Sequence, residues 1–363
     1  MAGGVKRRIA LLTAYPLHIP PSLRFRIGQY LPALQEAGYT IECIPFFSAQ
    51  QYQTFTARDT PILRRFGIIG SSFLGSLVRA INRGRWDGIY LHREATVLGT
   101  TLVEKLWMRG LPVIVDFDDA IWIVNVSEEN KRFAWLKSSQ KLPRLLRQAK
   151  VVTVCNEYLA AFARQYAEDV RIIPTTIDTD LYRALETPPK SYVVIGWSGS
   201  RTTTAHLRTI EGALVQLYKL YGDRIRFRFI GTSGYQPPFP AEILPWRADT
   251  EVEDLMKIDI GLMPLPDEDW SRGKCALKAL QYMALGKAAV VSPIGMNCEV
   301  IEDGVNGLFA RTLDDWVDKI SYLIEHPEVR QSLGRAAREV VERQYSVRAN
   351  TAKYMEAFEA AFK

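Results

Sequence analysis

The residues best suited to chemistry lie in one apolar segment, from Cys275 to Leu285. This segment has the pattern of a buried helix, yet it carries Lys274 at its start and Lys278 and Gln281 within it. At about 100° of rotation per residue, these three side chains fall within roughly 60° of one another. The pattern therefore predicts a nearly buried helix that presents two cations and one amide in a single direction.

The preceding run, residues 259–265, is apolar and has the pattern of a buried strand. A helix N-terminus after a parallel strand has free N–H groups and the positive end of the helix dipole, and both attract anions. Two lysines at such a position indicate a phosphorylated ligand. The alternative is that both lysines extend along apolar surface to reach solvent.

A second candidate phosphate site is the turn Ser198-Gly199-Ser200, which lies between an expected strand and an expected helix. Gly199 permits close approach of the backbone, and the serine hydroxyls can donate to phosphate oxygens. Arg201 could reach the same oxygens. The alternative is an ordinary helix N-cap.

Both halves of the chain alternate strand and helix patterns, which predicts two α/β domains with doubly wound parallel sheets. We expect an N-terminal domain over residues 1–180, a linker over 181–190 and a C-terminal domain over 191–345. Residues 346–363 would form a helix that packs back toward the N-terminal domain. Two long helices are expected in the first half, over residues 23–37 and 96–109. Ligands of such sheets bind beyond the carboxyl ends of the strands, here in a cleft between the two domains.

The composition is that of a globular protein, with 363 residues, 47% hydrophobic and 24% charged. No run approaches the roughly 18 apolar residues of a transmembrane helix. The net charge of +6 favours anionic partners. The chain has no zinc-finger or aromatic-basic pattern, so no nucleic acid is expected as a partner. Its four cysteines and four histidines are dispersed, and no metal site is expected.

Residues 278–291, Lys-Ala-Leu-Gln-Tyr-Met-Ala-Leu-Gly-Lys-Ala-Ala-Val-Val, resemble the K-x-L-E-Y-M-A-x-G-K-P-V-V block of retaining GT-B glycosyltransferases, group 1 or family 4-like. The stretch from Ser292 to Leu308 resembles the block that follows it, G…E-x-V-x-D-G-x-N-G-x-L. Residues 196–200, Gly-Trp-Ser-Gly-Ser, resemble the entry to the second domain in one branch of the family.

The resemblance implies a GT-B architecture, in which two Rossmann-like domains face each other across a cleft. It implies a nucleotide-diphosphate sugar held by the second domain and a saccharide or lipid-linked acceptor held by the first. Transfer would retain the anomeric configuration. No metal and no separate cofactor would be needed, because helix N-termini and cations take up the diphosphate charge.

The chain departs from the family pattern at one place. Many members carry two glutamates spaced as E-x7-E, and the second of them binds the ribose hydroxyls. Here Gly273 and Gln281 stand at these positions. Gln281 could still accept a hydrogen bond but carries no charge. The identity of the donor is therefore open.

The main catalytic demand in such a transfer is to stabilise the charge that develops on the leaving diphosphate. Lys278 is the first candidate for this role, and Lys274 or Arg272 is the second; surface charge is the alternative for all three. Trp246 follows a strand where the family places the base, although a core tryptophan is an equal alternative.

The first domain would supply further site residues. His92 follows an expected strand, and family members often carry a histidine near the donor sugar; a structural histidine is the alternative. Asp116 and Asp118 would share one face of a strand end. They could accept a proton from the acceptor hydroxyl, bind sugar hydroxyls or a metal, or cap a loop. Arg24 and Arg26 could meet an anionic acceptor.

Residues 64–85 combine apolar residues with five arginines, which is typical of a basic amphipathic segment. Such a segment could lie on an anionic membrane. A helix buried under the first domain is the alternative.

The sequence thus predicts a glycosyltransferase that transfers a sugar from a nucleotide-diphosphate sugar, in cell-surface polysaccharide or glycoconjugate synthesis. We expect a cytoplasmic location, with the inner face of the cell membrane as one place of action. One alternative is a non-catalytic protein of the same fold that binds a nucleotide or a glycan. The other is a nucleotide-sugar epimerase of related architecture.

Overall fold

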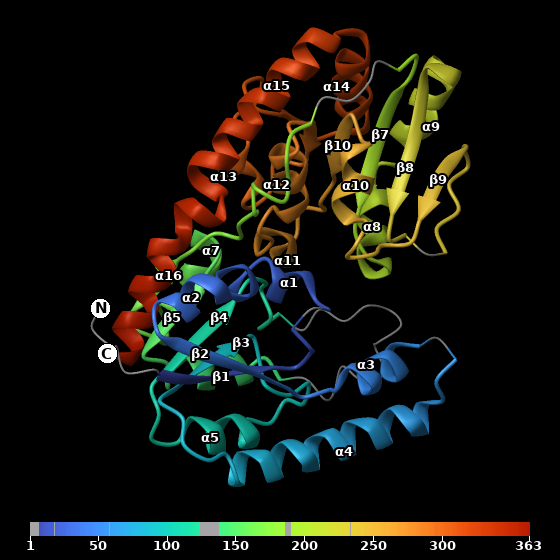
Figure 1. Ribbon diagram of the computed structural model, residues 1–363. Coiled ribbons are helices and arrows are strands. Elements are labelled where there is room, and N and C mark those ends of the chain that lie inside the picture. The colour runs from blue at the N-terminus through green and yellow to red at the C-terminus, as the bar shows by residue number, and fades with distance from the viewer. Residues whose placement is uncertain (1–6, 18, 58, 124–137, 186–189, 233) are drawn as a thin grey trace. The chain divides into compact units, whose positions relative to one another are not determined.

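The computed structural model describes residues 7–17, 19–57, 59–123, 138–185, 190–232 and 234–363. The chain divides into two compact units, and each is described by itself (Figure 1). The first unit contains residues up to Pro174 together with Asn350–Lys363, and the second contains Thr175–Ala349. The linker expected over residues 181–190 is thus counted with the second unit, and its residues 186–189 lie outside the described part.

The first unit is built on a parallel six-stranded sheet with the order β2-β1-β3-β4-β5-β6. Its strands are β1 (Arg7–Thr13), β2 (Tyr39–Pro45), β3 (Gly88–His92), β4 (Val113–Phe117), β5 (Val151–Val154) and β6 (Val170–Ile172). Its helices are α1 (Pro21–Arg24), α2 (Leu31–Glu36), α3 (Ala49–Thr56), α4 (Ile62–Ile81), α5 (Leu102–Met108), α6 (Lys141–Leu146) and α7 (Glu157–Ala163). Between α1 and α2 lies a short 3-10 turn, Ile27–Tyr30.

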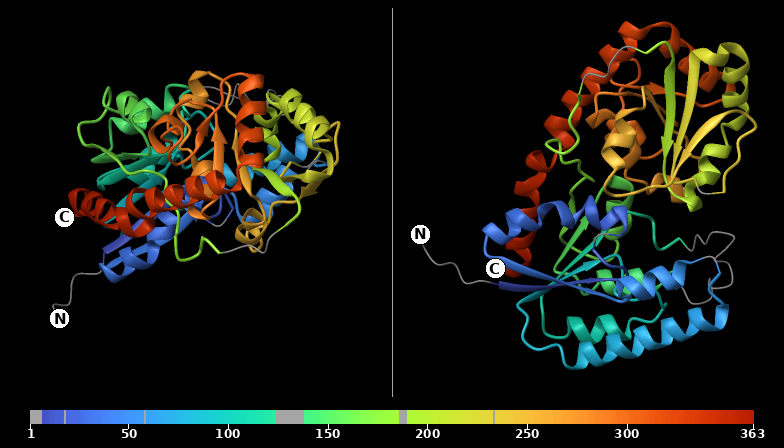
Figure 2. Two further views of the ribbon diagram at one scale, coloured as in Figure 1. Left: turned by 90° about the horizontal axis from the view of Figure 1, so that it is seen from above. Right: turned by 45° about the vertical axis from the view of Figure 1, so that its right-hand side comes forward.

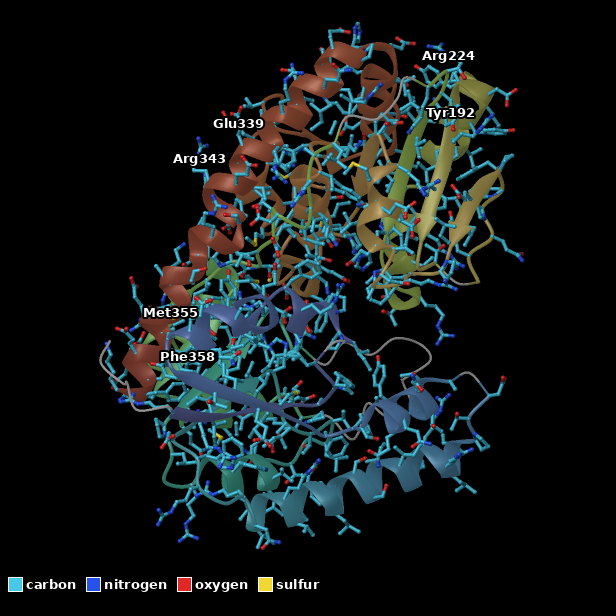
Figure 3. The ribbon with its side chains drawn as sticks, viewed as in Figure 1. Tyr192, Arg224, Glu339, Arg343, Met355 and Phe358 are labelled. Carbon is cyan, nitrogen blue, oxygen red and sulfur yellow. The ribbon has the colours of Figure 1, made fainter. Side chains whose placement is uncertain are left out.

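The C-terminal helix α16 (Val347–Phe362) packs on this sheet through aromatic side chains. The ring of Phe358, labelled in Figure 3, stacks on Tyr90 with a centroid distance of 5.7 Å and meets the edge of Tyr39 at 5.1 Å. Gly88 leaves room for the last aromatic ring, because a Cβ there would lie 2.3 Å from Phe362. Residues from the end of the chain therefore complete the core of the first unit.

The second unit repeats the parallel plan with the strand order β12-β11-β10-β7-β8-β9. Its strands are β7 (Val193–Ser198), β8 (Ile225–Ile230), β9 (Ala241–Leu244), β10 (Ile260–Met263), β11 (Ala288–Val291) and β12 (Leu308–Phe309). Its helices are α8 (Thr204–Arg208), α9 (Glu211–Tyr221), α10 (Glu251–Met256), α11 (Asp269–Arg272), α12 (Leu277–Ala284), α13 (Asn297–Val300), α14 (Leu313–Glu325) and α15 (Pro327–Val340). A short π-helical segment, Val341–Tyr345, follows α15.

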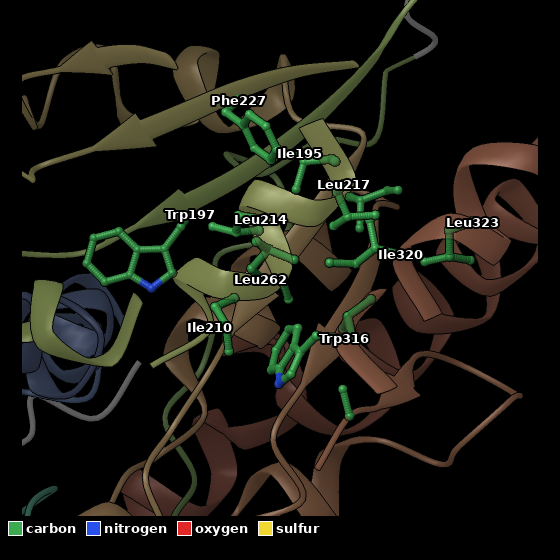
Figure 4. Close-up of a cluster of buried hydrophobic side chains, with 14 of the residues drawn as sticks. Ile195, Trp197, Ile210, Leu214, Leu217, Phe227, Leu262, Trp316, Ile320 and Leu323 are labelled. Carbon is green, nitrogen blue, oxygen red and sulfur yellow. The ribbon is translucent and has the colours of Figure 1, made fainter. Parts of the chain in front are cut away.

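One face of this sheet is covered by α9 and α14, which close a large apolar core (Figure 4). Leu214 and Leu217 of α9 meet Trp316 and Ile320 of α14 over the buried residues of the strands. Helix α14 starts at a capping box, in which the Thr312 hydroxyl accepts from the amide of Asp315. Such a cap satisfies amides that the first helical turn leaves unpaired.

Two expected helices are shorter than the sequence predicts. The helix expected over residues 23–37 breaks at Arg26, because that residue turns inward to a buried aspartate. The helix expected over residues 96–109 starts only at Leu102. The loop before it is held by Lys141, whose Nζ donates to the carbonyl oxygens of Thr96 at 2.6 Å and Leu98 at 2.7 Å.

Candidate active site

The candidate donor site lies in the second unit at the point where the strand order reverses. After β7 the chain continues to β8 and β9 on one side of the sheet, and β10 pairs with β7 on the other side. Ligands of open parallel sheets bind beyond the carboxyl ends of the strands at such a point. Two segments meet there: the turn at residues 198–200 that follows β7, and α12, which lies between β10 and β11.

Tyr282 locks these two segments together. The ring lies on Gly261 of β10, where a Cβ would come within 2.3 Å of the ring. The hydroxyl oxygen accepts a hydrogen bond from the amide of Ser198 at 3.0 Å. The absence of a side chain at residue 261 thus allows α12 to lie directly on the sheet, and the tyrosine fixes the end of β7 against it.

Basic side chains gather at this edge. The Nζ atom of Lys278 lies 5.4 Å from the ring centroid of Trp197, and Nζ of Lys274 lies 5.1 Å from that of Trp270. Burial, followed by the charges of Lys278 and Lys274, lowers the pKa of His206 to about 4. The imidazole is therefore neutral near pH 7, and the two lysine charges add to the effect of burial.

The structure does not align Lys274, Lys278 and Gln281 on one helix as the sequence predicts. Helix α12 starts at Leu277, so Lys278 and Gln281 lie on it but Lys274 precedes it. Ala276, between them, has a φ of 52°, in the left-handed region that residues with a Cβ adopt at a cost. The alignment of Lys274 by helical rotation is therefore wrong. A strained turn, and not a helix face, brings it near His206.

Gln281 belongs to a buried hydrogen-bond network. Its Nε2 donates to the hydroxyl of Tyr182 at 3.0 Å and to Oε1 of Glu251 at 3.3 Å. Tyr182 in turn donates to Oε2 of Glu251 at 3.0 Å, and Nε1 of Trp246 donates to Oε1 at 2.9 Å. A carboxylate accepts only, so this network turns the Gln281 amide nitrogen toward Glu251 and leaves the amide oxygen as the acceptor on the other side.

The remaining expected donor-site residues are placed as follows. Gly199 lies against Trp197, where a Cβ would come within 2.2 Å of the indole ring. Ser200 is exposed; its amide donates to the Thr203 hydroxyl at 2.9 Å, and its own hydroxyl lies 2.9 Å from that of Thr202. Arg201 starts that turn and is exposed. Arg272 is paired with Asp267 and Asp269, at 2.8 and 2.9 Å, which argues against the phosphate role expected for it.

A second cluster lies in the first unit, across three neighbouring strands. His92 of β3 is opposite Asp116 of β4, and Asp116 is opposite Thr153 of β5. All three side chains are buried. Oδ2 of Asp116 accepts from Nδ1 of His92 at 2.7 Å, and Oδ1 accepts from the Thr153 hydroxyl at 2.7 Å. The carboxylate therefore sits in the middle of a row of donors.

Arg26 completes this cluster and corrects an expectation. Its side chain is fully buried, forms an ion pair with Asp116 and donates to the carbonyl oxygen of Ile173. Burial alone would raise the pKa of Asp116, but Arg26 and His92 outweigh it and hold that pKa well below its usual range. Neither Arg26 nor Asp116 is exposed to meet an acceptor, so the acceptor-binding role expected for these two residues is wrong.

The same cluster sets the hydrogen-bonding state of His92. Because Nδ1–H donates to Asp116, the neutral imidazole carries its lone pair on Nε2. Within the described residues this buried Nε2 has no hydrogen-bond partner. It lies 4.0 Å from Oδ1 of Asp118. In that neutral form, Nε2 of His92 can accept a hydrogen bond from a hydroxyl group.

Asp118 was expected to accept a proton, but the structure ties it to an arginine. Nε of Arg93 donates to Oδ1 of Asp118 at 2.6 Å, and the same guanidinium reaches Asp119 at 2.6 Å. Arg93 has a φ of 59°, a strained conformation directly after His92. Because Oδ1 of Asp118 is bound by the Arg93 guanidinium, Asp118 helps to position the loop that follows β4.

Arg24, the other residue expected to bind an acceptor, lies at the end of α1 with its guanidinium 4.9 Å from the ring centroid of Phe25. It is half-buried, and nothing in the structure tests its expected role. Among the residues that the structure describes, no group of three or more His, Cys, Asp or Glu side chains is arranged to hold a metal ion. The pair Asp116 and Asp118 is instead bound by guanidinium groups.

Sequence reasoning missed several residues of both clusters, namely Thr153, Arg93, His206, Tyr182, Glu251 and Tyr282. Arg93 carried a local signal, because a charged residue directly follows the candidate histidine. Glu251 and Tyr182 carried none, since they meet Gln281 from 30 and 99 positions away.

Comparison with known families decides the class of the second unit. Residues 242–340 match the model of the family Glycosyl transferases group 1. The matched segment carries the lysine-bearing turn, α12 and Glu251. It identifies this segment as similar to that of a group 1 glycosyltransferase.

Solved structures of low sequence identity share the fold of this chain over nearly its whole length. Sucrose-phosphate synthase from Thermosynechococcus elongatus has a TM-score of 0.71 at 13% identity, covering 97% of this chain and 98% of that one. A glycosyltransferase from Rickettsia africae gives 0.67 at 15%, covering 98% and 99%. Anabaena HepE in complex with UDP-glucose gives 0.66 at 15%, covering 98% and 100%. No curated protein sequence matches the chain. The expected GT-B architecture, with two parallel α/β units, is confirmed.

Proposed function

We propose that the chain transfers a sugar from a nucleotide-diphosphate sugar to a saccharide or lipid-linked acceptor, with retention of the anomeric configuration. The observation that carries the proposal is the position of Lys278 and Lys274 at the carboxyl edge of β7 and β10, where Nζ of Lys278 lies 5.4 Å from the Trp197 ring and both charges, after burial, help to lower the pKa of His206. A leaving diphosphate needs such positive charges at the moment of bond cleavage. The UDP-glucose bound to HepE supports the choice of donor class.

In this proposal Lys278 stabilises the charge on the leaving phosphate, and Lys274 adds to it from the turn before α12. The backbone at Ser198 and Gly199, together with Arg201, contacts the phosphates from the β7 side. The Gln281 amide oxygen accepts from a ribose hydroxyl, because Glu251 and Tyr182 hold the amide in that orientation. Trp246 lies beside Glu251 and borders the base. No metal or separate cofactor takes part.

In the first unit, Nε2 of His92 accepts a hydrogen bond from a sugar hydroxyl. Asp116 fixes the tautomer that makes this possible, and Arg26 keeps Asp116 ionised. A cytoplasmic location and a part in cell-surface polysaccharide or glycoconjugate synthesis belong to the same proposal.

A thermal-shift panel of nucleoside diphosphates and their sugars tests the donor site. We expect a concentration-dependent rise in Tm with one base, and its loss in Lys278→Ala, because binding to the native state alone stabilises it. Lys257→Ala is the matched control, since Lys257 is a surface lysine of the same unit paired with Glu253. The donor assignment fails if no nucleotide shifts Tm, or if Lys278→Ala responds as the wild type does. NMR of the first-formed product tests retention, and an inverted anomer contradicts it.

A further inference from the structure

Helix α4 exposes several of its large aliphatic side chains, while its buried side includes two serines. The side chains of α4 that are buried against the first unit are Ile69, Ser72, Ser76 and Ala80. On the opposite side, the exposed fractions are 82% for Leu63, 64% for Leu74, 57% for Val78 and 70% for Ile81. A surface helix that is amphipathic for folding alone shows the reverse order.

The exposed apolar residues form a single stripe. Leu63, Leu74, Val78 and Ile81 are separated by 11, 4 and 3 positions, so they recur on one face of the helix. Ile62 and Phe66, each 40% exposed, extend this stripe at the N-terminal end of α4. Helix α5 packs beside α4 in Figure 1 and in the right view of Figure 2. We call this set the α4 face.

The charge around the α4 face has one sign. From Thr60 to Trp86 the sequence has five arginines and neither Asp nor Glu. Arg65, Arg79 and Arg83 donate to the backbone carbonyl oxygens of Ala57, Pro45 and Leu106, which leaves their charge uncompensated. None of the five forms an ion pair with a described residue. Lys105 and Arg109, on and after α5, are exposed and add two more positive charges.

We propose that the α4 face docks on the surface of an anionic lipid bilayer. An apolar stripe bordered by arginines matches the interface between acyl chains and anionic headgroups, where both features stabilise binding. In the described part of the chain, no helix is long and apolar enough to cross a membrane. The helix therefore lies along the interface.

The same charges disfavour the other simple occupant, a second copy of this chain. In a two-fold symmetric dimer the same patch meets itself. The arginines around one α4 face would then approach those around the other, and like charges brought together at an interface repel. Lipid docking needs no donor or acceptor sugar, so it stands independently of the proposed function.

Flotation of the full chain with lipid vesicles tests the proposal. We expect the protein to float with phosphatidylcholine vesicles that contain roughly 30 mol% phosphatidylglycerol, and to stay behind with phosphatidylcholine alone. Raising the salt from about 0.1 M to about 0.5 M should weaken the binding, because exposed charges are screened. Binding that is equal on both vesicle types, or absent from both, overturns the proposal.

Two variants locate the surface. Leu74→Glu/Val78→Glu should lower vesicle binding at least about tenfold, since two buried apolar contacts are replaced by charges that the anionic surface repels. Leu220→Glu on α9, whose leucine is 61% exposed, is the matched control and should bind as the wild type does. Circular dichroism and Tm check that the variants fold. Vesicle binding that survives the double change, or a dimer in solution that the double change abolishes, rejects the lipid assignment.

Discussion

The two clusters use charge in opposite ways. In the first unit, the cation of Arg26 meets the carboxylate of Asp116 within the sheet, and both are sealed from solvent. In the second unit, Lys274 and Lys278 carry charges of the same sign, and both act on a neutral His206. A compensated charge is a structural element, whereas a concentration of one sign is a binding site for the other. The difference distinguishes a cation that is paired inside a sheet from two cations that lie close to each other at a strand edge.

The largest effect is expected when the buried ion pair of the first unit is broken. Asp116→Asn leaves the buried guanidinium of Arg26 without its carboxylate, and should lower the free energy of unfolding by about 3–5 kcal/mol. Urea unfolding measures it. The double variant Arg26→Met/Asp116→Asn should regain part of the loss, because the unpaired charge is gone. A double variant no more stable than Asp116→Asn would contradict this account.

Removing a cation from the second unit should affect catalysis and leave stability unchanged. Lys278→Ala should lower kcat by about 10²–10³-fold, because an interaction with the developing diphosphate charge is lost. Steady-state kinetics with the donor found in the nucleotide panel gives the value. An unchanged kcat would remove the catalytic role assigned to Lys278, and a large fall in Tm would make that role structural.

Placing a glutamate at residue 281, as in the family pattern described above, should lower the stability of the protein. In Gln281→Glu a second carboxylate would stand where the amide now donates to Glu251 at 3.3 Å. Loss of that bond and repulsion should lower the free energy of unfolding by about 1–3 kcal/mol. Adding Glu251→Gln should rescue stability, since one carboxylate then faces one amide again. If the single variant is as stable as the wild type, the network does not fix the amide.

The smallest expected effect concerns pH. A bound diphosphate offsets the lysine charges and raises the pKa of His206 from about 4 toward its ordinary value. Protonated His206 is then favoured in the complex, so nucleotide affinity should rise by about threefold to tenfold from about pH 7.5 to about pH 5.5. Calorimetry at both pH values measures it. His206→Gln should lose the part of this rise that is due to His206, while the titration of the phosphate itself remains; identical profiles would exclude His206.

The sequence predicted well what depends on local pattern and poorly what depends on distant partners. The parallel strands and α12 were found because apolar runs and helical periodicity are local. Strands β6 and β9 were missed because both are short edge strands with a charged residue in the middle. The break at Arg26 was missed because its cause, Asp116, lies 90 positions away.

In the candidate site, too, local patterns were predicted correctly and contacts between distant residues were not. Lys278 was recognised from the helix and from the family block, and the structure places it on α12 beside the end of β7, where we propose that a diphosphate binds. The orientation of Gln281 could not be predicted, because Tyr182 and Glu251 reach it only through the tertiary fold. Arg26 was misread because nothing near it in the sequence shows that its charge is already compensated.

The missing side chain of Gly261 gives the donor edge its rigidity. Because the Tyr282 ring lies directly on the backbone of β10 and its hydroxyl holds the amide of Ser198, the serine turn and the lysine helix move as one body. They come from segments 84 positions apart, yet neither has to be ordered by the ligand. The proposed diphosphate site is therefore preorganised, and the protein should lose little conformational entropy when the ligand binds.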